Sequence, residues 1–225
     1  MKDSNNNQSR RQALKTMFAT GSLMAFGSIA KTQTAEACGP LTPAQPKGPF
    51  YPIASQIDTD TDLTRIQASA QVAQGRVITI KGIVQDEACK PLAEAIVEIW
   101  QACHSGRYNH PGDPNNAPLD PHFQYWGIAK TNAKGEYSFK TVLPGAYPAD
   151  AQWMRPPHVH FKVNKWGYQE LVTQLYFEGE KFNDSDLYIK ALSPAQRALV
   201  VRPITKVETR QRVSEVVSFP LVLKR

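Results

Sequence analysis

Short runs rich in β-branched and aromatic residues, separated by turn residues, recur along most of this 225-residue chain. The runs lack the 3.6-residue period of an amphipathic helix, so they indicate strands. Seventeen prolines and thirteen glycines punctuate the chain, which favours a turn-rich β protein over a helix bundle. The expected strands are 76–85, 93–101, 136–141, 158–164, 170–177 and 213–223.

These strands predict an all-β fold, an antiparallel β-sandwich with long active-site loops and a few short helices. The longest loop, 105–127, is rich in Pro, Asn and Asp, and such loops in compact domains are often functional. Two short helices are expected, over 62–71 with Asp62 as N-cap and over 193–201 with Ser193 as N-cap.

Proline stands at every third position from Pro40 to Pro52. That spacing excludes a helix and predicts an extended N-terminal arm over residues 38–60. The arm and the strands that follow predict one domain from 38 to 225.

The first 37 residues resemble an export signal. Arg10 and Arg11 precede a mostly apolar run from 17 to 30, and Ala35-Glu36-Ala37 follows. A charged start, an apolar run and small residues at the exit form a secretory pattern, and the paired arginines resemble the twin-arginine type. The run is shorter than the about 20 residues that span a bilayer. We therefore expect a periplasmic mature chain without a transmembrane segment. A lipid anchor at Cys38 is disfavoured, because Ala35 stands where a lipoprotein signal usually has Leu.

The formal charge is +6 for the whole chain. The export segment holds five basic and two acidic side chains, so +3 remains afterwards. The remaining basic residues form no stripe, and no nucleic-acid partner is expected. Of the three cysteines, Cys89 and Cys103 flank an extended strand that would hold them too far apart for a bridge. A bridge from Cys38 to Cys103 is favoured, and the sequence leaves the pairing of the three cysteines otherwise open.

His158 and His160 are the sharpest local signal, because alternate residues of a strand project from the same face. Two imidazoles on one face fit metal binding, although two solvent-facing histidines would give the same pattern. Tyr108 lies where a strand breaks into the long loop, and Tyr147 lies in the turn after Pro144. Either tyrosine alone is more often a packing or surface residue.

Six ordered motifs extend this pattern. They are Trp100-Gln101 with Gly106-Arg107-Tyr108 and His110, Pro118-Leu119-Asp120-Pro121, Gly135-x-Tyr137-Ser138-Phe139, Pro144-Gly145-x-Tyr147-Pro148, Arg155-Pro156-x-His158-x-His160-Phe161 and Thr173-Gln174-Leu175-Tyr176-Phe177. Together they resemble the intradiol ring-cleaving dioxygenases, most of all the iron-binding subunit of the protocatechuate 3,4-dioxygenase type. The resemblance covers about residues 45 to 180, and Gly48-Pro49-Phe50-Tyr51 resembles that family's N-terminal arm.

The resemblance implies one non-haem Fe(III) per chain. The four implied ligands are Tyr108, Tyr147, His158 and His160. Ferric iron is a hard ion that suits phenolate oxygen, while imidazole supplies nitrogen. The implied reaction uses O₂ to open a catechol, protocatechuate above all, between its two hydroxyl-bearing carbons to a cis,cis-muconate product. The resemblance assigns proton uptake to Tyr147, stabilisation of the charged substrate to Arg155 and a place in the pocket wall to Gln174.

Three alternatives stay open. The stretch from Tyr147 to Arg155 is shorter than in the protocatechuate enzyme, and Ala149 stands where that enzyme has Trp, so another catechol could be preferred. His158 and His160 could instead form a 2-His-1-carboxylate site with Asp150 or Glu170. Residues 84–99 also resemble transthyretin-like binding modules, which have no catalytic role. Because this chain carries a full ligand set, the family resemblance implies a homo-oligomer with a catechol and O₂ as its small-molecule partners.

Overall fold

The computed structural model describes residues 39–54, 56, 58–67, 69–209 and 213–225. The expected export segment, residues 1–37, and Cys38 lie outside this part of the chain. The elements in chain order are β1 (Val77–Asp86), β2 (Ile96–Trp100), β3 (Trp126–Lys130), β4 (Glu136–Val142), β5 (Tyr147–Pro148), β6 (Met154–Arg155), β7 (His158–Asn164), β8 (Leu171–Phe177), α1 (Leu187–Lys190), α2 (Pro194–Val200), β9 (Val201–Arg202), β10 (Thr205–Glu208), β11 (Val213–Ser218) and β12 (Leu221–Leu223).

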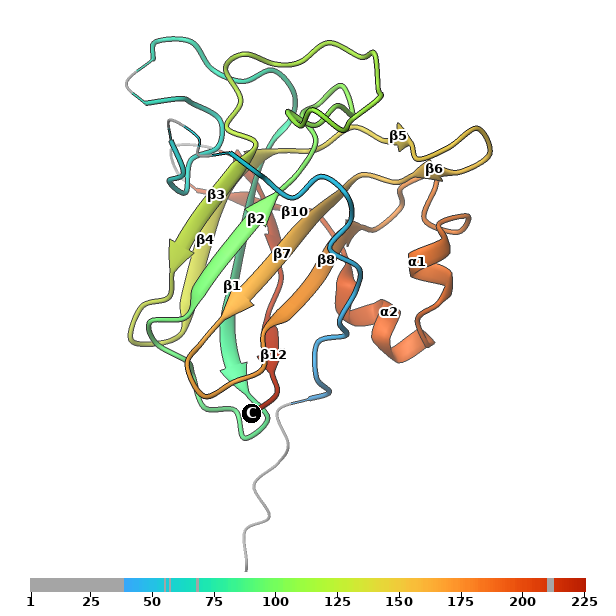
Figure 1. Cartoon of the computed structure of the whole chain (residues 1–225). Helices are drawn as coiled ribbons and strands as arrows, with labels where there is room; N and C mark the ends of the chain where they lie inside the picture. Colours follow the sequence, from blue (N-terminus) through green and yellow to red (C-terminus); the bar gives the residue numbers. More distant parts are fainter. Residues whose placement is uncertain (1–38, 55, 57, 68, 210–212) are drawn as a thin grey trace, which may run out of the picture. The chain divides into compact units, whose positions relative to one another are not determined.

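The strands form two large sheets and one small one. The first large sheet has the order β10-β11-β1-β12, with β4 also paired to β1, and the second has the order β3-β2-β7-β8-β9. The two lie face to face, and a two-stranded β5-β6 ribbon stands beside the end at which the long loops gather (Figure 1). Three pairs are parallel, β1–β11, β1–β12 and β8–β9, and the others are antiparallel. The predicted all-β sandwich is confirmed.

Alternation along β7 divides its residues between two environments. Val159 and Phe161 point into the core between the sheets and are fully buried. Phe161 packs against Phe219 and Tyr137 from the first sheet and its connections, with ring centroids 4.9 and 6.1 Å away. The histidines of β7 therefore project from the opposite side. We call this side of the second sheet the outer face.

The N-terminal arm crosses the outer face beside β8 (Figure 1). Its described residues form neither helix nor strand, as the proline spacing predicted. The Gln45 backbone N–H donates to the Val172 carbonyl at 2.8 Å. Further along, the Tyr51 hydroxyl donates to Glu98 at 2.8 Å and accepts from Lys162 at 2.9 Å. The arm thus covers polar side chains that an open sheet would leave in water.

Two expectations about elements are wrong. The described residues of 62–71 form turns and a bridge from Asp62 to Lys140, because the Asp62 carboxylate accepts from the backbone N–H of Thr64 and closes a turn. The expected strand 213–223 is split into β11 and β12 at Phe219, whose N–H donates to the Lys81 carbonyl at 2.8 Å. The expected helix at 193–201 is α2, which begins with a capping box at Ser193.

The predicted disulfide partner is also wrong. Cys103 is a free, fully buried thiol whose sulfur lies 3.2 Å from the Ser105 hydroxyl. Among the described residues the disulfide-bonded cysteine is Cys89, which stands half-buried in the turn after β1. Cys103 lies three residues after β2, where its buried sulfur faces the Ser105 hydroxyl and the Pro118 carbonyl rather than another sulfur.

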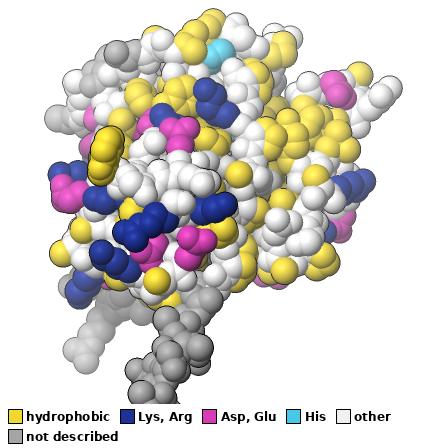
Figure 2. Space-filling view, turned by 60° about the horizontal axis from the view of Figure 1, so that its bottom comes forward, with side chains coloured by type: hydrophobic (Ala, Val, Ile, Leu, Met, Phe, Trp, Pro, Cys, Tyr) yellow, Lys and Arg dark blue, Asp and Glu magenta, His cyan; other side chains and the backbone are white. Residues whose placement is uncertain are grey.

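No helix within the described ranges is long and apolar enough to cross a membrane. On the face that Figure 2 presents, acidic and basic side chains lie intermixed. Ion pairs such as Lys140 with Asp62 at 2.9 Å neutralise charge locally. Exposed pairs of this kind contribute little to stability.

Candidate metal centre and active site

The two histidines of β7 project together from the outer face. His158 and His160 are 1% and 2% exposed, and their ring centroids lie 4.9 Å apart. The His158 Nδ1 lies 2.7 Å from the Pro156 carbonyl, which can only accept, so Nδ1 carries the proton and Nε2 keeps its lone pair. The His160 ring stacks on Trp100 of β2 at 4.8 Å and 8°. Both rings are therefore held in fixed orientations.

Two loops bring the tyrosines to these rings. Tyr108 follows β2 in the long loop, where its backbone N–H donates to Asp113 at 2.7 Å, and Tyr147 lies in β5. The loops touch at Gly106, whose φ is +86° and whose missing Cβ would lie 2.3 Å from the Ala146 carbonyl oxygen. A larger residue at Gly106 would force the two loops apart.

The four side chains converge on one place. The Tyr108 hydroxyl lies 3.3 Å from the His158 Nε2. The Tyr147 ring lies 5.5 Å from both the Tyr108 and the His158 rings, and Tyr108 lies 6.2 Å from His160, between ring centroids. All four residues are at least 95% buried. The structure therefore brings together every residue that the sequence assigned to the metal.

Burial keeps these groups uncharged in the protein alone. Desolvation, and next the neighbouring Tyr147, raise the pKa of Tyr108 well above its ordinary value. Desolvation also raises the pKa of Tyr147, and the positive charge of Arg155 opposes this. Desolvation, followed by Arg155, holds the pKa values of His158 and His160 well below the usual range. A bound cation would reverse the tyrosine shifts, because it stabilises phenolate.

The donor set fits trivalent iron. Two phenol oxygens and two imidazoles combine hard oxygen with borderline nitrogen ligands. The Nδ1 proton of His158 is held by a carbonyl, which is the usual arrangement behind a metal-bound imidazole. Within the described part of the chain, no three His, Cys, Asp or Glu side chains are placed to share a metal. The carboxylate alternative with Asp150 or Glu170 thus finds no geometric support, since both are exposed.

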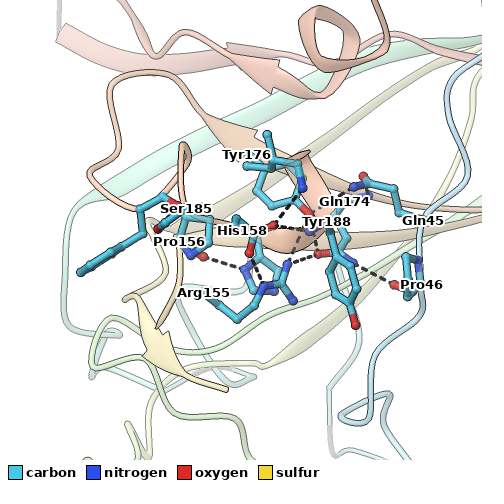
Figure 3. A network of polar contacts seen from close by, with 12 residues as sticks. Gln45, Pro46, Arg155, Pro156, His158, Gln174, Tyr176, Ser185 and Tyr188 are labelled. Atoms are coloured by element: carbon cyan, nitrogen blue, oxygen red, sulfur yellow. Dashed lines mark hydrogen bonds and ion pairs between the residues drawn. The ribbon is translucent and has the colours of Figure 1, made fainter. Parts of the chain in front are cut away.

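Arg155 and Gln174 lie beside the cluster, as Figure 3 shows for Arg155, His158 and Gln174. The Arg155 Nη2 donates to the Gln174 Oε1 at 2.7 Å and to the Tyr176 hydroxyl at 3.3 Å. Gln174 is fully buried, and its Nε2 donates to the Pro46 carbonyl of the arm at 2.8 Å. A buried, fixed guanidinium next to the four clustered side chains is suited to stabilising negative charge on a bound molecule.

The arm closes the cluster from the other side. Gly48 has φ +74°, and a Cβ there would lie 3.2 Å from the His160 Cε1. The Phe50 ring lies 4.8 Å from Tyr108 and 6.2 Å from Tyr147 between centroids. A separate hollow of about 380 Å³ borders His110 and is lined by none of the four cluster residues. The covered cluster and this hollow are therefore separate features of the described structure.

Sequence reasoning missed three residues of this network. Gln45 accepts from the backbone N–H of Gln174 at 3.0 Å and donates to the Tyr176 hydroxyl at 3.2 Å. Asp186 accepts from the Arg155 Nε at 2.7 Å. The signal for Tyr176 was available, because it lies two residues after Gln174 and so on the same face of β8. Asp186 carried no such signal, because the short helix α1 that it caps was not expected from the sequence.

Comparisons with known proteins identify the family of this chain. The model of a family described as dioxygenase matches residues 47–225. The β chain of protocatechuate 3,4-dioxygenase from Burkholderia cepacia is 34% identical over 180 residues, covering 78% of this chain and 76% of that protein. This chain belongs to the intradiol ring-cleaving dioxygenase family.

Other relatives broaden the range of substrates within the family. Catechol 1,2-dioxygenase 2 of Acinetobacter lwoffii is 30% identical over 184 residues. The match covers 72% of the present chain but only 61% of that enzyme. A solved dioxygenase domain, from a dioxygenase–carbohydrate-binding protein fusion of Streptomyces sp. SirexAA-E, is 29% identical with a TM-score of 0.60. The alignment covers 82% of the present chain and 99% of that solved domain. Intradiol dioxygenases generally use non-haem iron.

Proposed function

We propose that this chain binds one Fe(III) and uses O₂ to open the ring of a catechol between its two hydroxyl-bearing carbons, with protocatechuate as the expected substrate. The observation that carries the proposal is the convergence of Tyr108, Tyr147, His158 and His160 from three separate segments onto one buried place. A binding module without chemistry would have no need to bury two phenols against two imidazoles, because each loses its contact with water.

The four convergent side chains would hold the ion. When bound, ferric iron would draw a catechol into its coordination sphere and prepare the ring for reaction with O₂. Two phenolates, from Tyr108 and Tyr147, would offset part of the charge of the bound ion in a place that both side chains share with little access for water. We assign to the Tyr147 oxygen the uptake of a substrate hydroxyl proton, since a free phenol holds its proton firmly at this buried position.

Arg155 is proposed to stabilise the negative charge of the bound catechol. Its guanidinium stays cationic at any working pH and is 4% exposed. At a site from which water is largely excluded, a positive charge acts more strongly on a neighbouring anion than it would in water. Gln174 would hold one end of this guanidinium and form part of the pocket wall.

We also propose export to the periplasm through the twin-arginine route, because that route suits an enzyme that folds around its metal before it is exported. The mature protein would then assemble as a homo-oligomer, since each chain carries a full ligand set. Size-exclusion chromatography of the periplasmic fraction tests both proposals.

The decisive experiment measures iron content, visible absorption and O₂ uptake on the purified protein. Phenolate bound to Fe(III) absorbs visible light, so the loaded protein should be red and should consume O₂ with at least one of catechol, protocatechuate and hydroxyquinol. A colourless protein that takes up zinc in preference to iron, or a red protein inert toward all three catechols, would contradict the proposal. The relative rates with the three compounds identify the ring substituent.

A further inference from the structure

Asp186 is a fully buried carboxylate that serves two segments at once. Its Oδ1 accepts from the backbone N–H groups of Tyr188 and Ile189, both at 3.0 Å, and so caps the start of α1. Its Oδ2 accepts from the Arg155 Nε at 2.7 Å. The same side chain therefore fixes the position of α1 and one edge of the guanidinium.

The guanidinium is fixed on its other sides as well (Figure 3). Nη2 donates to Gln174 and Tyr176, and the Tyr188 and Trp153 rings lie 4.5 and 5.2 Å from the guanidinium carbon. Among the described residues Nη1 has no hydrogen-bond partner. One nitrogen of Arg155 is thus left for an external ligand, and the orientation of that nitrogen depends on what holds the Nε edge.

A neutral side chain in place of Asp186 could not hold the Nε edge of the Arg155 guanidinium equally well. The side chains of Arg155 and Asp186 are 4% and 0% exposed, so neither charge is screened by water. A buried cation without its anion would turn toward any other acceptor or toward solvent. In Asp186→Asn the side chain could still cap α1, so the Tyr188 ring would stay over the guanidinium while the charge that holds the Nε edge is lost.

We propose that Asp186 is the positioning residue for Arg155, and that it holds the Arg155 Nη1 as the donor presented to the negatively charged oxygen of the bound catechol. This proposal rests on the proposed function. It assigns a role to a residue about 30 positions away in sequence, on a different element of the fold.

The test compares Asp186→Asn with wild type and with Ser193→Ala. Asn caps helices as well as Asp does, so Asp186→Asn should keep α1 and the iron while it removes the negative charge. We expect kcat per bound iron to fall about 10- to 100-fold, in keeping with the loss of a charged hydrogen bond. The affinity for 4-nitrocatechol, titrated by its visible spectrum without O₂, should fall as well. Ser193→Ala removes the cap of α2, a helix that makes no hydrogen bond to Arg155 within the described structure, and should lower the melting temperature without changing kcat.

A double-mutant cycle with Arg155→Ala separates positioning from folding. In the Arg155→Ala background, the further change Asp186→Asn should leave kcat unchanged, because no guanidinium remains to be oriented. An additional loss of kcat in that background, or wild-type kcat and 4-nitrocatechol affinity in Asp186→Asn alone, would overturn the positioning role. If the iron-loaded wild type opens no catechol, the proposed function fails instead. The two failures are thereby distinguished.

Discussion

Gly48 lies where the arm passes beside His160 of the candidate metal centre, and Gly48→Ala tests whether that approach matters. The residue has φ +74°, in the left-handed region that side chains other than glycine rarely adopt. An added Cβ would lie 3.2 Å from the His160 Cε1 and 3.7 Å from its Nε2. The substitution therefore strains the backbone and presses on a proposed iron ligand.

These two effects have different magnitudes. Left-handed backbone costs an alanine about 1–2 kcal/mol, and this cost falls on folding stability. The contact at 3.2 Å requires the His160 ring to move by a few tenths of an ångström, and the ring has little freedom because it stacks on Trp100. Disturbing the groups that orient a metal ligand typically lowers metal affinity about 10- to 100-fold. We expect Gly48→Ala to show both losses.

Gly167→Ala is the matched control. Gly167 has φ +82° in the turn between β7 and β8, and no atom lies within 4 Å of its would-be Cβ. Urea unfolding of the metal-free proteins should show a similar loss of about 1–2 kcal/mol for both variants. Competition with an iron chelator, followed by the visible band, should show weaker iron binding in Gly48→Ala alone. Equal iron affinity in the two variants would refute the idea that the arm holds His160 in place.

Three further predictions concern the centre itself. Tyr108→Phe or His160→Ala should lose the iron and the colour, measured as iron per chain, and full activity in either variant would remove that residue from the ligand set. Arg155→Ala should keep its iron and yet turn over at least about tenfold more slowly, because it loses charge stabilisation in a dry site; an unchanged kcat would contradict its assigned role. The metal-free protein should lose stability as the pH falls below about 6.5, because buried His158 and His160 have lowered pKa values when folded and take up protons on unfolding. The free energy of unfolding should fall by up to about 1.4 kcal/mol per pH unit for each histidine. Urea unfolding measured from pH 7 to pH 5 should show a smaller fall in His158→Gln than in wild type.

The central strands and the paired histidines of β7 could be predicted from the sequence because both are local patterns. The alternation of β7 places His158 and His160 on one face whatever the rest of the chain does. The two tyrosines could be assigned only through the motifs around them, since no local rule says that loops about 40 residues apart will meet. Gly106 carries that information physically, because it allows the two loops to touch.

Other features could not be predicted, because long-range contacts decide them. Asp62 has the capping chemistry of a helix start, yet its backbone neighbours pair with β4, where the Leu63 N–H donates to the Lys140 carbonyl at 2.8 Å. Leu63 is fully buried in the core, and this burial outweighs the helix preference of the segment. The partner of Asp186 was hidden for a similar reason, since a carboxylate before a four-residue helix gives no sign that a distant arginine will bind it.

The position of the centre on the outer face explains why an arm is needed at all. In β7 the histidines and Lys162 occupy the positions that alternation would normally give to solvent. Water there would compete for the proposed metal and screen the charge of Arg155. The proline-spaced arm covers this face. Because an extended chain has no internal hydrogen bonds, its backbone groups are free to bond with the sheet, and the Pro46 carbonyl accepts from Gln174 in this way. The arm therefore contributes to the candidate site, through the Pro46 carbonyl beside Gln174 and through Gly48 beside His160.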